Sequence, residues 1–368
     1  MSEQFADYAV TQKNSRGRAH PEKPHPYRPD FERDRDRIIH CSAFRRLEGK
    51  TQVFTPGLDD YYRTRLTHSI EVAQIGRTIA KELRLNESLT EAICLAHDLG
   101  HSPFGHAGEK VLNDLMGELA PAQAGSGFEH NRQTLRIIDL LEHPYPDFTG
   151  LNLMYETRLG LAKHTSTYDQ PQNGTFSEAS CSLEGQIADL ADRIAYNCHD
   201  LEDGMRAGLI DGEKLDAKIV KRAESQINAC AIGDRTIRRT RTAKAIIDML
   251  VSDCLETSKK LLADANVKTV GDVYNAGENF IAISAESEAE LAELEDFLMQ
   301  NFYTHKSLLQ TSDKIRTWLE KLFKRFSDKP ELMPGYFQRF IKDQGLERTV
   351  CDYIAGMTDR FCLNLLEK

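Results

Sequence analysis

Residues 95–109 read Leu95-Ala-His-Asp-Leu-Gly-His-Ser-Pro-Phe-Gly-His-Ala-Gly-Glu109 and place three histidines, an aspartate and a glutamate among small residues. Apolar spacing predicts a helix over 89–99, and Gly100 is well placed to end it. Because a buried His–Asp pair is costly without partners, His97 and Asp98 need hydrogen bonds or a ligand. The pair alone is compatible with an ordinary core histidine, so its role depends on the rest of the chain.

Other imidazoles and carboxylates lie near this stretch in the sequence. Five of the 12 histidines fall between positions 68 and 130. On the helix predicted over 178–205, Asp192, Tyr196 and Asp200 are four residues apart and therefore share one face. A solvated face usually mixes Lys and Glu, which this face lacks. Two histidines and two aspartates from three helices would form a mixed nitrogen and oxygen site for Mn, Fe, Co, Zn, Ni or Mg.

The segment after Gly100 adds groups that could move protons. His106 and Glu109 are three residues apart at the start of the next helix, a spacing at which the carboxylate orients the imidazole. His101 and His130 add two further imidazoles. Several imidazoles beside a metal suit phosphate chemistry, because they supply positive charge and a proton donor for an alkoxide leaving group. A structural hydrogen bond is the alternative reading of each histidine taken singly.

The rest of the chain is predicted to be helical, so the fold class is mainly α. The further ranges with helical spacing of apolar residues are 64–85, 128–141, 151–163, 236–263, 291–302, 307–326 and 346–366. The first thirty residues are rich in proline and charge, which favours an extended segment. Residues 267–284 alternate more like strands and are compatible with one small β-hairpin.

Composition narrows the class of protein. The chain has 368 residues, 40% of them hydrophobic, and a formal net charge of −10. This charge argues against a protein whose main work is coating nucleic acid, although a local basic patch stays open. No stretch has the roughly 18 apolar residues of a membrane span, and no apolar leader begins the chain, so we expect a cytoplasmic protein without membrane contact. The eight cysteines include no C-x-x-C pair and predict reduced thiols.

Several blocks together resemble the HD-domain deoxynucleoside triphosphate triphosphohydrolases, and most closely the bacterial deoxyguanosinetriphosphate triphosphohydrolase-like proteins. The blocks are Asp34–Leu47, Lys50–Phe54, Tyr62–Val72, Ala96–Glu109 and Asp192–Asp200. They span roughly residues 30–205. Three segments are much more specific to this family than the spacing of His and Asp alone. They are Phe-Arg-Arg-Leu, Lys-Thr-Gln-Val-Phe and Pro-Phe-Gly-His-Ala-Gly-Glu. Phe302-Tyr-Thr-His-Lys306 further resembles a phosphate- or nucleotide-contacting segment of these enzymes.

The resemblance implies a role for each candidate residue. Four would ligate one divalent metal: His68, His97, Asp98 and Asp192. Four would serve the chemistry: His106 with Glu109 behind it, His130 at the phosphate and leaving oxygen, and His101 as an orienting group. Four would bind substrate: Arg65 the phosphate, Gln52 the deoxyribose, Tyr196 the 2′ position and Asp200 the 3′-hydroxyl. The implied reaction is attack of water on the α-phosphorus of a dNTP, which releases deoxynucleoside and tripolyphosphate.

The resemblance also implies an organisation and leaves alternatives. We expect an extended segment over 1–30, an HD phosphohydrolase core over 31–210 and a helical C-terminal region over 211–368 packed on it. A homo-oligomer is expected, with an allosteric nucleotide or single-stranded DNA as further partners. Two other functions stay open: an HD phosphohydrolase of other nucleotides, and a nucleotide-sensing regulator that binds single-stranded DNA.

Overall fold

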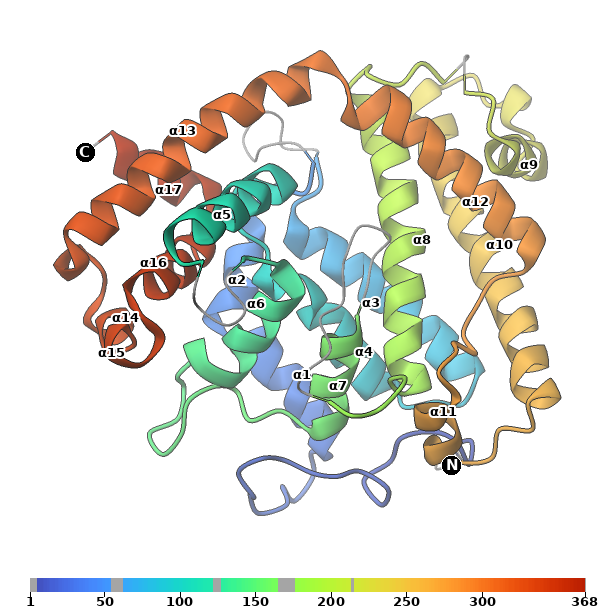
Figure 1. Cartoon of the computed structure of the whole chain (residues 1–368). Helices are drawn as coiled ribbons and strands as arrows, with labels where there is room; N and C mark the ends of the chain where they lie inside the picture. The colour runs from blue at the N-terminus through green and yellow to red at the C-terminus, as the bar shows by residue number, and fades with distance from the viewer. Residues whose placement is uncertain (1–4, 54–61, 122–126, 165–175, 213–214, 368) are drawn as a thin grey trace. The chain divides into compact units, whose positions relative to one another are not determined.

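The computed structural model describes residues 5–53, 62–121, 127–164, 176–212 and 215–367 (Figure 1). Regular structure in these residues is helical apart from two isolated β-bridges, which confirms the mainly α fold class. The α-helices are α1 (Asp30–His40), α2 (Ser42–Arg46), α3 (Arg65–Glu82), α4 (Glu87–Ala96), α5 (Gly105–Leu119), α6 (His130–Arg136), α7 (Tyr155–Lys163), α8 (Leu183–Arg206), α9 (Lys218–Gln226), α10 (Arg235–Asp264), α11 (Val270–Ala276), α12 (Ala285–Leu298), α13 (Lys306–Asp328), α14 (Gly335–Gln338), α15 (Ile341–Gln344), α16 (Leu346–Ala355) and α17 (Asp359–Leu366).

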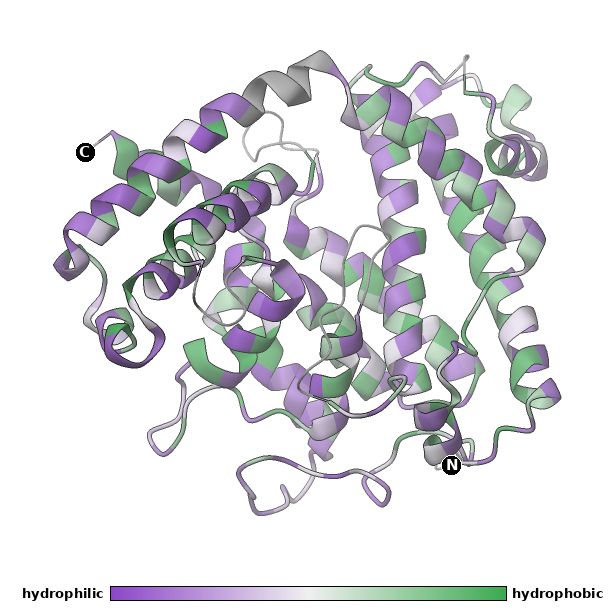
Figure 2. Cartoon of the chain, viewed as in Figure 1, coloured by the Kyte–Doolittle hydropathy of each residue, from purple (hydrophilic) through white to green (hydrophobic). Residues whose placement is uncertain are grey.

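The chain forms two compact units whose sequences interleave. The first unit comprises Met1–Arg37, His68–Leu95 and Leu153–His305, and the second comprises Ile38–Thr67, Ala96–Asn152 and Lys306–Lys368. Figure 2 shows that the helices carry both hydrophobic and hydrophilic residues, as expected of amphipathic helices. The division into 1–30, 31–210 and 211–368 stays a prediction.

The long helix α8 is central to the first unit. It begins where the Ser182 hydroxyl accepts a hydrogen bond from the Gly185 amide, an ordinary N-cap. It packs against α7, α10 and α12. Its apolar residues at Ile187, Ala191 and Ile194 are fully buried, as the helical periodicity predicts. This packing leaves the neighbouring face of α8 to carry polar groups.

Buried carboxylates hold the N-terminal segment on the first unit. Glu184 accepts the Val10 amide at 2.9 Å and the Asn86 amide at 3.2 Å. Asp34 accepts the Met154 amide at 2.8 Å and pairs with Arg18 at 2.5 Å. Residues 5–29 contain no helix, so the Val10 amide finds its acceptor in the Glu184 side chain, and the Arg18 side chain is held by Asp34.

The second unit has its own apolar core. Helix α13 packs against α5, α16 and α17. The fully buried members of this core include Leu112, Met116, Leu319, Leu322, Val350, Ile354 and Cys362. The helix predicted over 346–366 is two helices, because α16 ends at Ala355 and Thr358 caps α17.

The predicted β-hairpin over 267–284 is wrong. Residues Val270–Ala276 form α11, and residues 277–284 form no strand. Thr269 and Asp272 form a reciprocal capping box, which satisfies the first amides of a helix. The amides of Phe280 and Ile281 donate to the Gln186 side chain instead of to a partner strand. Local capping and a long-range side chain therefore replace the expected strand pairing.

All eight cysteines lie in the described residues as free thiols, seven of them buried. Among the described helices, none combines the length and apolar character needed to cross a bilayer.

Removal of Asp34 should destabilise the first unit strongly. Asp34→Ala would leave the Arg18 guanidinium, 4% exposed, without its buried partner, so the free energy of unfolding should fall by about 3–5 kcal/mol. Asp30→Ala is the matched control, because Asp30 is 30% exposed and lies 3.8 Å from the same guanidinium. Its cost should stay below about 1 kcal/mol. Equal thermal unfolding midpoints for the two variants would contradict the prediction.

Candidate active site

The first unit brings together His68 from α3 and Asp192 from α8. His68 Nε2 lies 2.9 Å from Asp192 Oδ1, and both residues are buried. The other ring nitrogen, Nδ1, lies 3.1 Å from His199 Nδ1. His199 Nε2 in turn lies 2.6 Å from Glu71. A chain of hydrogen bonds therefore fixes the ring of His68 and turns Nε2 toward the carboxylate.

His164 is a buried partner of the same carboxylate that the sequence prediction missed. Its Nδ1 lies 2.5 Å from Asp189, and its Nε2 lies 3.7 Å from Asp192 Oδ2. Burial opposes its protonation, but the charges and hydrogen bonds of Asp189 and Asp192 outweigh burial and raise its pKa. An isolated histidine outside the cluster of positions 68–130 carries no sequence signal for this role.

Tyr196 and Asp200 lie on the same face of α8, as their spacing predicts. Each has a partner from the segment of α12 and the turn that follows it. The Tyr196 hydroxyl donates to Glu295 at 2.8 Å, and the Tyr303 hydroxyl donates to Asp200. Tyr303 lies in the segment 302–306 that the resemblance indicated, whereas Glu295 carried no signal. The side chain of Lys306, in the same segment, lies outside the described residues.

In the second unit, His97 and Asp98 lie on a 3₁₀ turn, His97–Gly100, that follows α4. Asp98 Oδ2 accepts from Arg65 at 3.0 Å, and Oδ1 lies 2.9 Å from His101 Nε2 and 3.5 Å from His97 Nε2. Burial opposes ionisation of Asp98, but electrostatic interactions with His97 and the Arg65 guanidinium, together with the hydrogen bond with His101, lower its pKa well below the usual range. Asp98 is therefore an ionised carboxylate in a buried setting.

Gly100 is required by close packing. A Cβ at this position would lie 2.0 Å from the carbonyl oxygen of His130 and 2.4 Å from the amide nitrogen of Thr134 on α6. The Thr134 hydroxyl accepts from the Gly100 amide at 2.9 Å and donates to the His97 carbonyl at 3.1 Å. The 3₁₀ turn that carries His97 and Asp98 is thus locked onto α6.

The loop after Gly100 is held by residues from distant parts of the second unit. The Lys50 ammonium, 2% exposed, donates to the carbonyls of His101 and Ala355. Burial, helped by the charges of Arg46 and Arg65, lowers the pKa of Lys50 to about 7. Asp359 accepts from the Phe104 amide at 2.9 Å. These contacts keep the loop in place.

Two left-handed residues shape the end of this loop. Phe104 has φ of 65° and Gly105 has φ of 59°. A left-handed phenylalanine is unfavourable, so the surrounding contacts must maintain it. The turn brings the Gly105 Cα region close to the Gln52 carbonyl and to the Arg65 guanidinium. Gln52 and Arg65, both predicted substrate contacts, therefore lie near the start of α5.

Glu109 organises the remaining imidazoles of the second unit. Its Oε1 accepts the His130 amide at 2.8 Å and lies 3.0 Å from His130 Nδ1. Its Oε2 lies 3.7 Å from His106 Nδ1 and 3.8 Å from His101 Nδ1. The His101 and His130 rings stack at 4.0 Å. The structure therefore brings all four predicted catalytic residues into one cluster.

The titration of these groups follows from the same contacts. Burial opposes ionisation of Glu109, yet the hydrogen bonds from His106 and His130 and the electrostatic effect of His130 lower its pKa. Burial and the charges of Arg65 and His130 lower the pKa of His101 despite Asp98. The side chain of His106 is 70% exposed. The cluster thus combines an anion, a buried neutral imidazole and an accessible imidazole.

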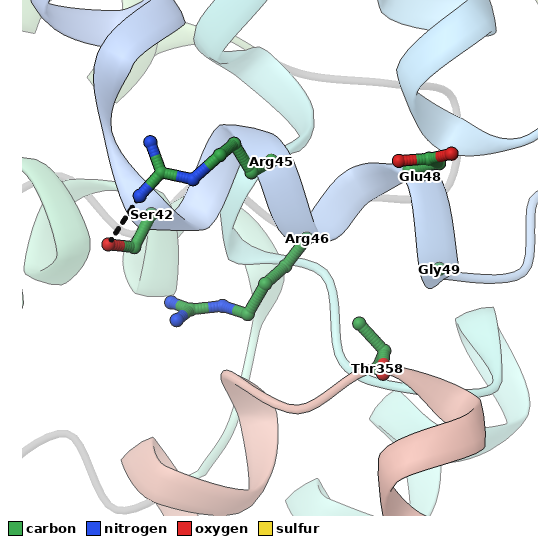
Figure 3. Close-up of a pocket in the computed structure, with 6 residues that line it drawn as sticks. All are labelled: Ser42, Arg45, Arg46, Glu48, Gly49 and Thr358. Atoms are coloured by element: carbon green, nitrogen blue, oxygen red, sulfur yellow. Dashed lines mark hydrogen bonds between the residues drawn. The ribbon is translucent and has the colours of Figure 1, made fainter.

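A pocket of about 550 Å³ lies elsewhere on the second unit (Figure 3). Its lining residues are Ser42, Arg45, Arg46, Glu48, Gly49 and Thr358. Arg45 donates to the His40 carbonyl at 2.8 Å and to the Ser42 hydroxyl at 3.3 Å, and Arg46 lies 4.0 Å from Glu142. The guanidinium groups of Arg45 and Arg46 thus have partners within the protein. None of the residues that line the pocket is a predicted site residue.

The chain is similar to two families of domain. An HD domain matches residues 65–197, and a phosphohydrolase-associated domain matches residues 281–368. The HD match includes all four predicted metal ligands. The second match includes α13, α16 and α17 of the second unit and the whole of α12, which carries Glu295.

Curated relatives match nearly the whole chain. A deoxyguanosinetriphosphate triphosphohydrolase-like protein of Geobacter sulfurreducens is 46% identical over 365 residues, which cover 98% of this chain and 93% of the relative. A protein of the same description from Bordetella parapertussis is 46% identical over 377 residues, covering 99% and 95%. One from Ralstonia pickettii is 43% identical over 367 residues, covering 98% and 92%.

The lowered pKa of Glu109 predicts an acid-sensitive contribution to stability. An unfolded glutamate titrates near pH 4.3. The native carboxylate therefore stabilises the fold above that pH, and its contribution is lost as the pH falls toward the lowered native pKa. The difference in thermal midpoint between the wild type and Glu109→Gln should be largest at pH 5–6 and should shrink toward pH 3. Glu118→Gln, an exposed glutamate on the same helix, should show no such trend. A constant difference across this range would contradict the assignment.

Proposed function

Because the chain belongs to the family of HD-domain deoxyguanosinetriphosphate triphosphohydrolase-like proteins, we propose that it hydrolyses deoxynucleoside triphosphates, dGTP among them, to deoxynucleoside and tripolyphosphate. One observation carries the proposal: each unit buries one imidazole beside one carboxylate of the predicted ligand set. These pairs are His68 with Asp192, and His97 with Asp98. Nucleotide hydrolysis by an HD phosphohydrolase needs such donors.

The donors fit a divalent metal. Two imidazole nitrogens and two carboxylates form a mixed set that Mn, Mg, Co, Ni, Fe or Zn can accept. The pKa of Asp98 is lowered, which favours its anionic form, and the ring of His68 is oriented by His199. We assign His68, His97, Asp98 and Asp192 as the ligands. A metal bound there would polarise an oxygen of the α-phosphate as a Lewis acid.

The imidazole cluster of the second unit, with Arg65, would bind the negatively charged phosphate and transfer protons. Arg65 is a permanent cation suited to a phosphate oxygen. Glu109 holds His130 through Nδ1, which assigns Nε2 to the proton transfer. As water attacks the α-phosphorus and the bond to the 5′-oxygen breaks, His130 would give a proton to that oxygen. His106, accessible and beside Glu109, would assist the incoming water, and His101 would orient the reacting groups.

The polar face of α8 would select the sugar. Asp200 would accept from the 3′-hydroxyl, and the ring of Tyr196 would occupy the space that a 2′-hydroxyl needs. Gln52 would contact the deoxyribose, and its Oε1 is buried without a hydrogen-bond partner among the described residues. Such a site rejects ribonucleotides without reading the base, which suits activity on more than one dNTP.

Products identify the reaction. With Mn²⁺ or Mg²⁺, anion-exchange analysis of dGTP incubations should show deoxyguanosine and tripolyphosphate in equal amounts, since the α-phosphorus bond to the 5′-oxygen is the one that breaks. Monophosphate with pyrophosphate would refute this bond assignment, and activity confined to other nucleotides would indicate the alternative HD phosphohydrolase.

The same assay should cover all four dNTPs, singly and mixed, and with single-stranded DNA. The proposal includes a cytoplasmic homo-oligomer in which a second nucleotide or DNA regulates the site. An Asp98→Ala protein that binds no metal yet keeps its full biological effect would favour the regulatory alternative.

Substitutions at a metal ligand and at a proton-transfer residue should have different effects on bound metal and on activity. Asp192→Ala should lose bound metal, measured by elemental mass spectrometry after dialysis, together with activity. His106→Ala should keep its metal but lose roughly 10²–10⁴-fold in kcat, because it removes a proton-transfer group alone. His143→Ala, an exposed histidine outside the predicted set, should change neither. Loss of metal from His106→Ala would move His106 into the ligand set.

A further inference from the structure

Glu295 gathers the polar side chains of one turn of α8. It accepts from Arg193 Nε at 2.8 Å and Nη2 at 3.0 Å, from the Tyr196 hydroxyl at 2.8 Å, and from Asn197 Nδ2 at 2.9 Å. Its side chain is only 12% exposed. A carboxylate with four donors in a largely buried setting forms strong, charge-assisted hydrogen bonds. Glu295 therefore fixes the side chains that flank the predicted sugar-contacting position.

We propose that Glu295 is a positioning residue that holds the Tyr196 ring against the 2′ position and thereby sets the preference for deoxyribonucleotides over ribonucleotides. The proposal rests on the proposed function of the α8 face and adds a residue to it. Glu295 acts through Tyr196 and touches no substrate itself.

Ring rigidity is the physical basis. A tyrosine side chain has two main torsions, and an anchored hydroxyl restricts both. A ring held in one place overlaps an added hydroxyl group, whereas a ring free to swing lets that group in. Displacement of a positioned group by about 1 Å is enough to change rates by roughly 10²-fold.

A similar contact lies one helical turn further along α8. Asp200, one helical turn after Tyr196, accepts from the Tyr303 hydroxyl. Tyr303 ends the π-helical turn Met299–Tyr303 that continues α12. The α12 segment thus presents Glu295 and Tyr303 to two successive sugar-facing residues of α8. A segment within the phosphohydrolase-associated match therefore completes a face that the HD match begins.

The negative charge of Glu295 strengthens its hydrogen bond with the Tyr196 hydroxyl. Burial opposes ionisation of Glu295, but the hydrogen bonds and charge of Arg193 with the hydrogen bonds from Asn197 and Tyr196 lower its pKa. The carboxylate stays an acceptor at neutral pH, so the Tyr196 hydroxyl must act as the donor.

The chain offers a matched control on the same helix. Glu288 pairs with the same Arg193 guanidinium at 2.8 Å, and its side chain is 49% exposed. Glu288→Ala therefore weakens the ion pair of Arg193 and leaves the acceptor of the Tyr196 hydroxyl in place. Any effect specific to Glu295→Ala then belongs to the contacts that Glu295 itself makes, with Tyr196, Asn197 and Arg193.

The readout is the ratio of kcat/KM for dGTP to that for GTP, measured on the full chain with Mn²⁺. Glu295→Ala should lower this ratio at least about tenfold, as expected for loss of a hydrogen bond to a charged group. GTP turnover should rise while dGTP turnover changes less. Glu288→Ala should keep the ratio within about twofold, in line with an exposed ion pair.

Two further variants separate positioning from a general structural effect. Tyr196→Phe keeps the ring but lacks the anchored hydroxyl, so its effect on the ratio and that of Glu295→Ala should not add in the double variant. Glu295→Gln keeps an acceptor oxygen and should restore most of the discrimination. Additive effects would overturn the proposal. So would an unchanged ratio in a folded Glu295→Ala protein, or equal losses of dGTP and GTP turnover.

The outcomes also distinguish this proposal from the proposed function. If the wild type releases tripolyphosphate from dGTP and Glu295→Ala keeps its discrimination, only the role of Glu295 fails. If the wild type neither binds nor hydrolyses dGTP, the proposed function fails and the role of Glu295 fails with it.

Discussion

The buried carboxylate of Asp98 is the constraint on which the second unit's site depends. An ionised side chain in a protein interior must be paired and hydrogen-bonded. Arg65 and His101 meet this need, each at a different oxygen of the carboxylate. Their positions require the His101–Gly105 loop to keep its shape, and Lys50 and Asp359 secure that loop. The need to pair one buried carboxylate therefore explains why residues far apart in the sequence lie together around it.

The same physical rule recurs through the molecule. Asp34 and Glu184 tie an N-terminal segment without helices to the first unit, and Glu109 assembles imidazoles in the second. Glu295 does this for the polar face of α8. In each case a carboxylate accepts several donors at once, which gives direction to groups that apolar packing would leave free to rotate.

Sequence reasoning recovered the helices well, because burial follows a 3.6-residue period that the sequence displays directly. It failed at residues 267–284, where Thr269 and Asp272 cap a short helix and Gln186 takes the amides that a strand partner would have paired. It also missed His164 and Glu295. A single histidine or a glutamate on a polar helix has no periodic signal, and its role depends on which side chain meets it in space.

The sequence by itself determined the helical class, the family, and the residue types and spacing of the candidate site, because helical periodicity and the His/Asp blocks are local properties of the chain. Only the tertiary structure decided which donors face which acceptors. It showed that Gly100 is needed for contact with α6, that Lys50 holds the His101 carbonyl, and that Glu295 anchors Tyr196. These pairings join residues 34, 51 and 99 positions apart, and hydrogen bonds depend on distance and angle rather than on sequence order.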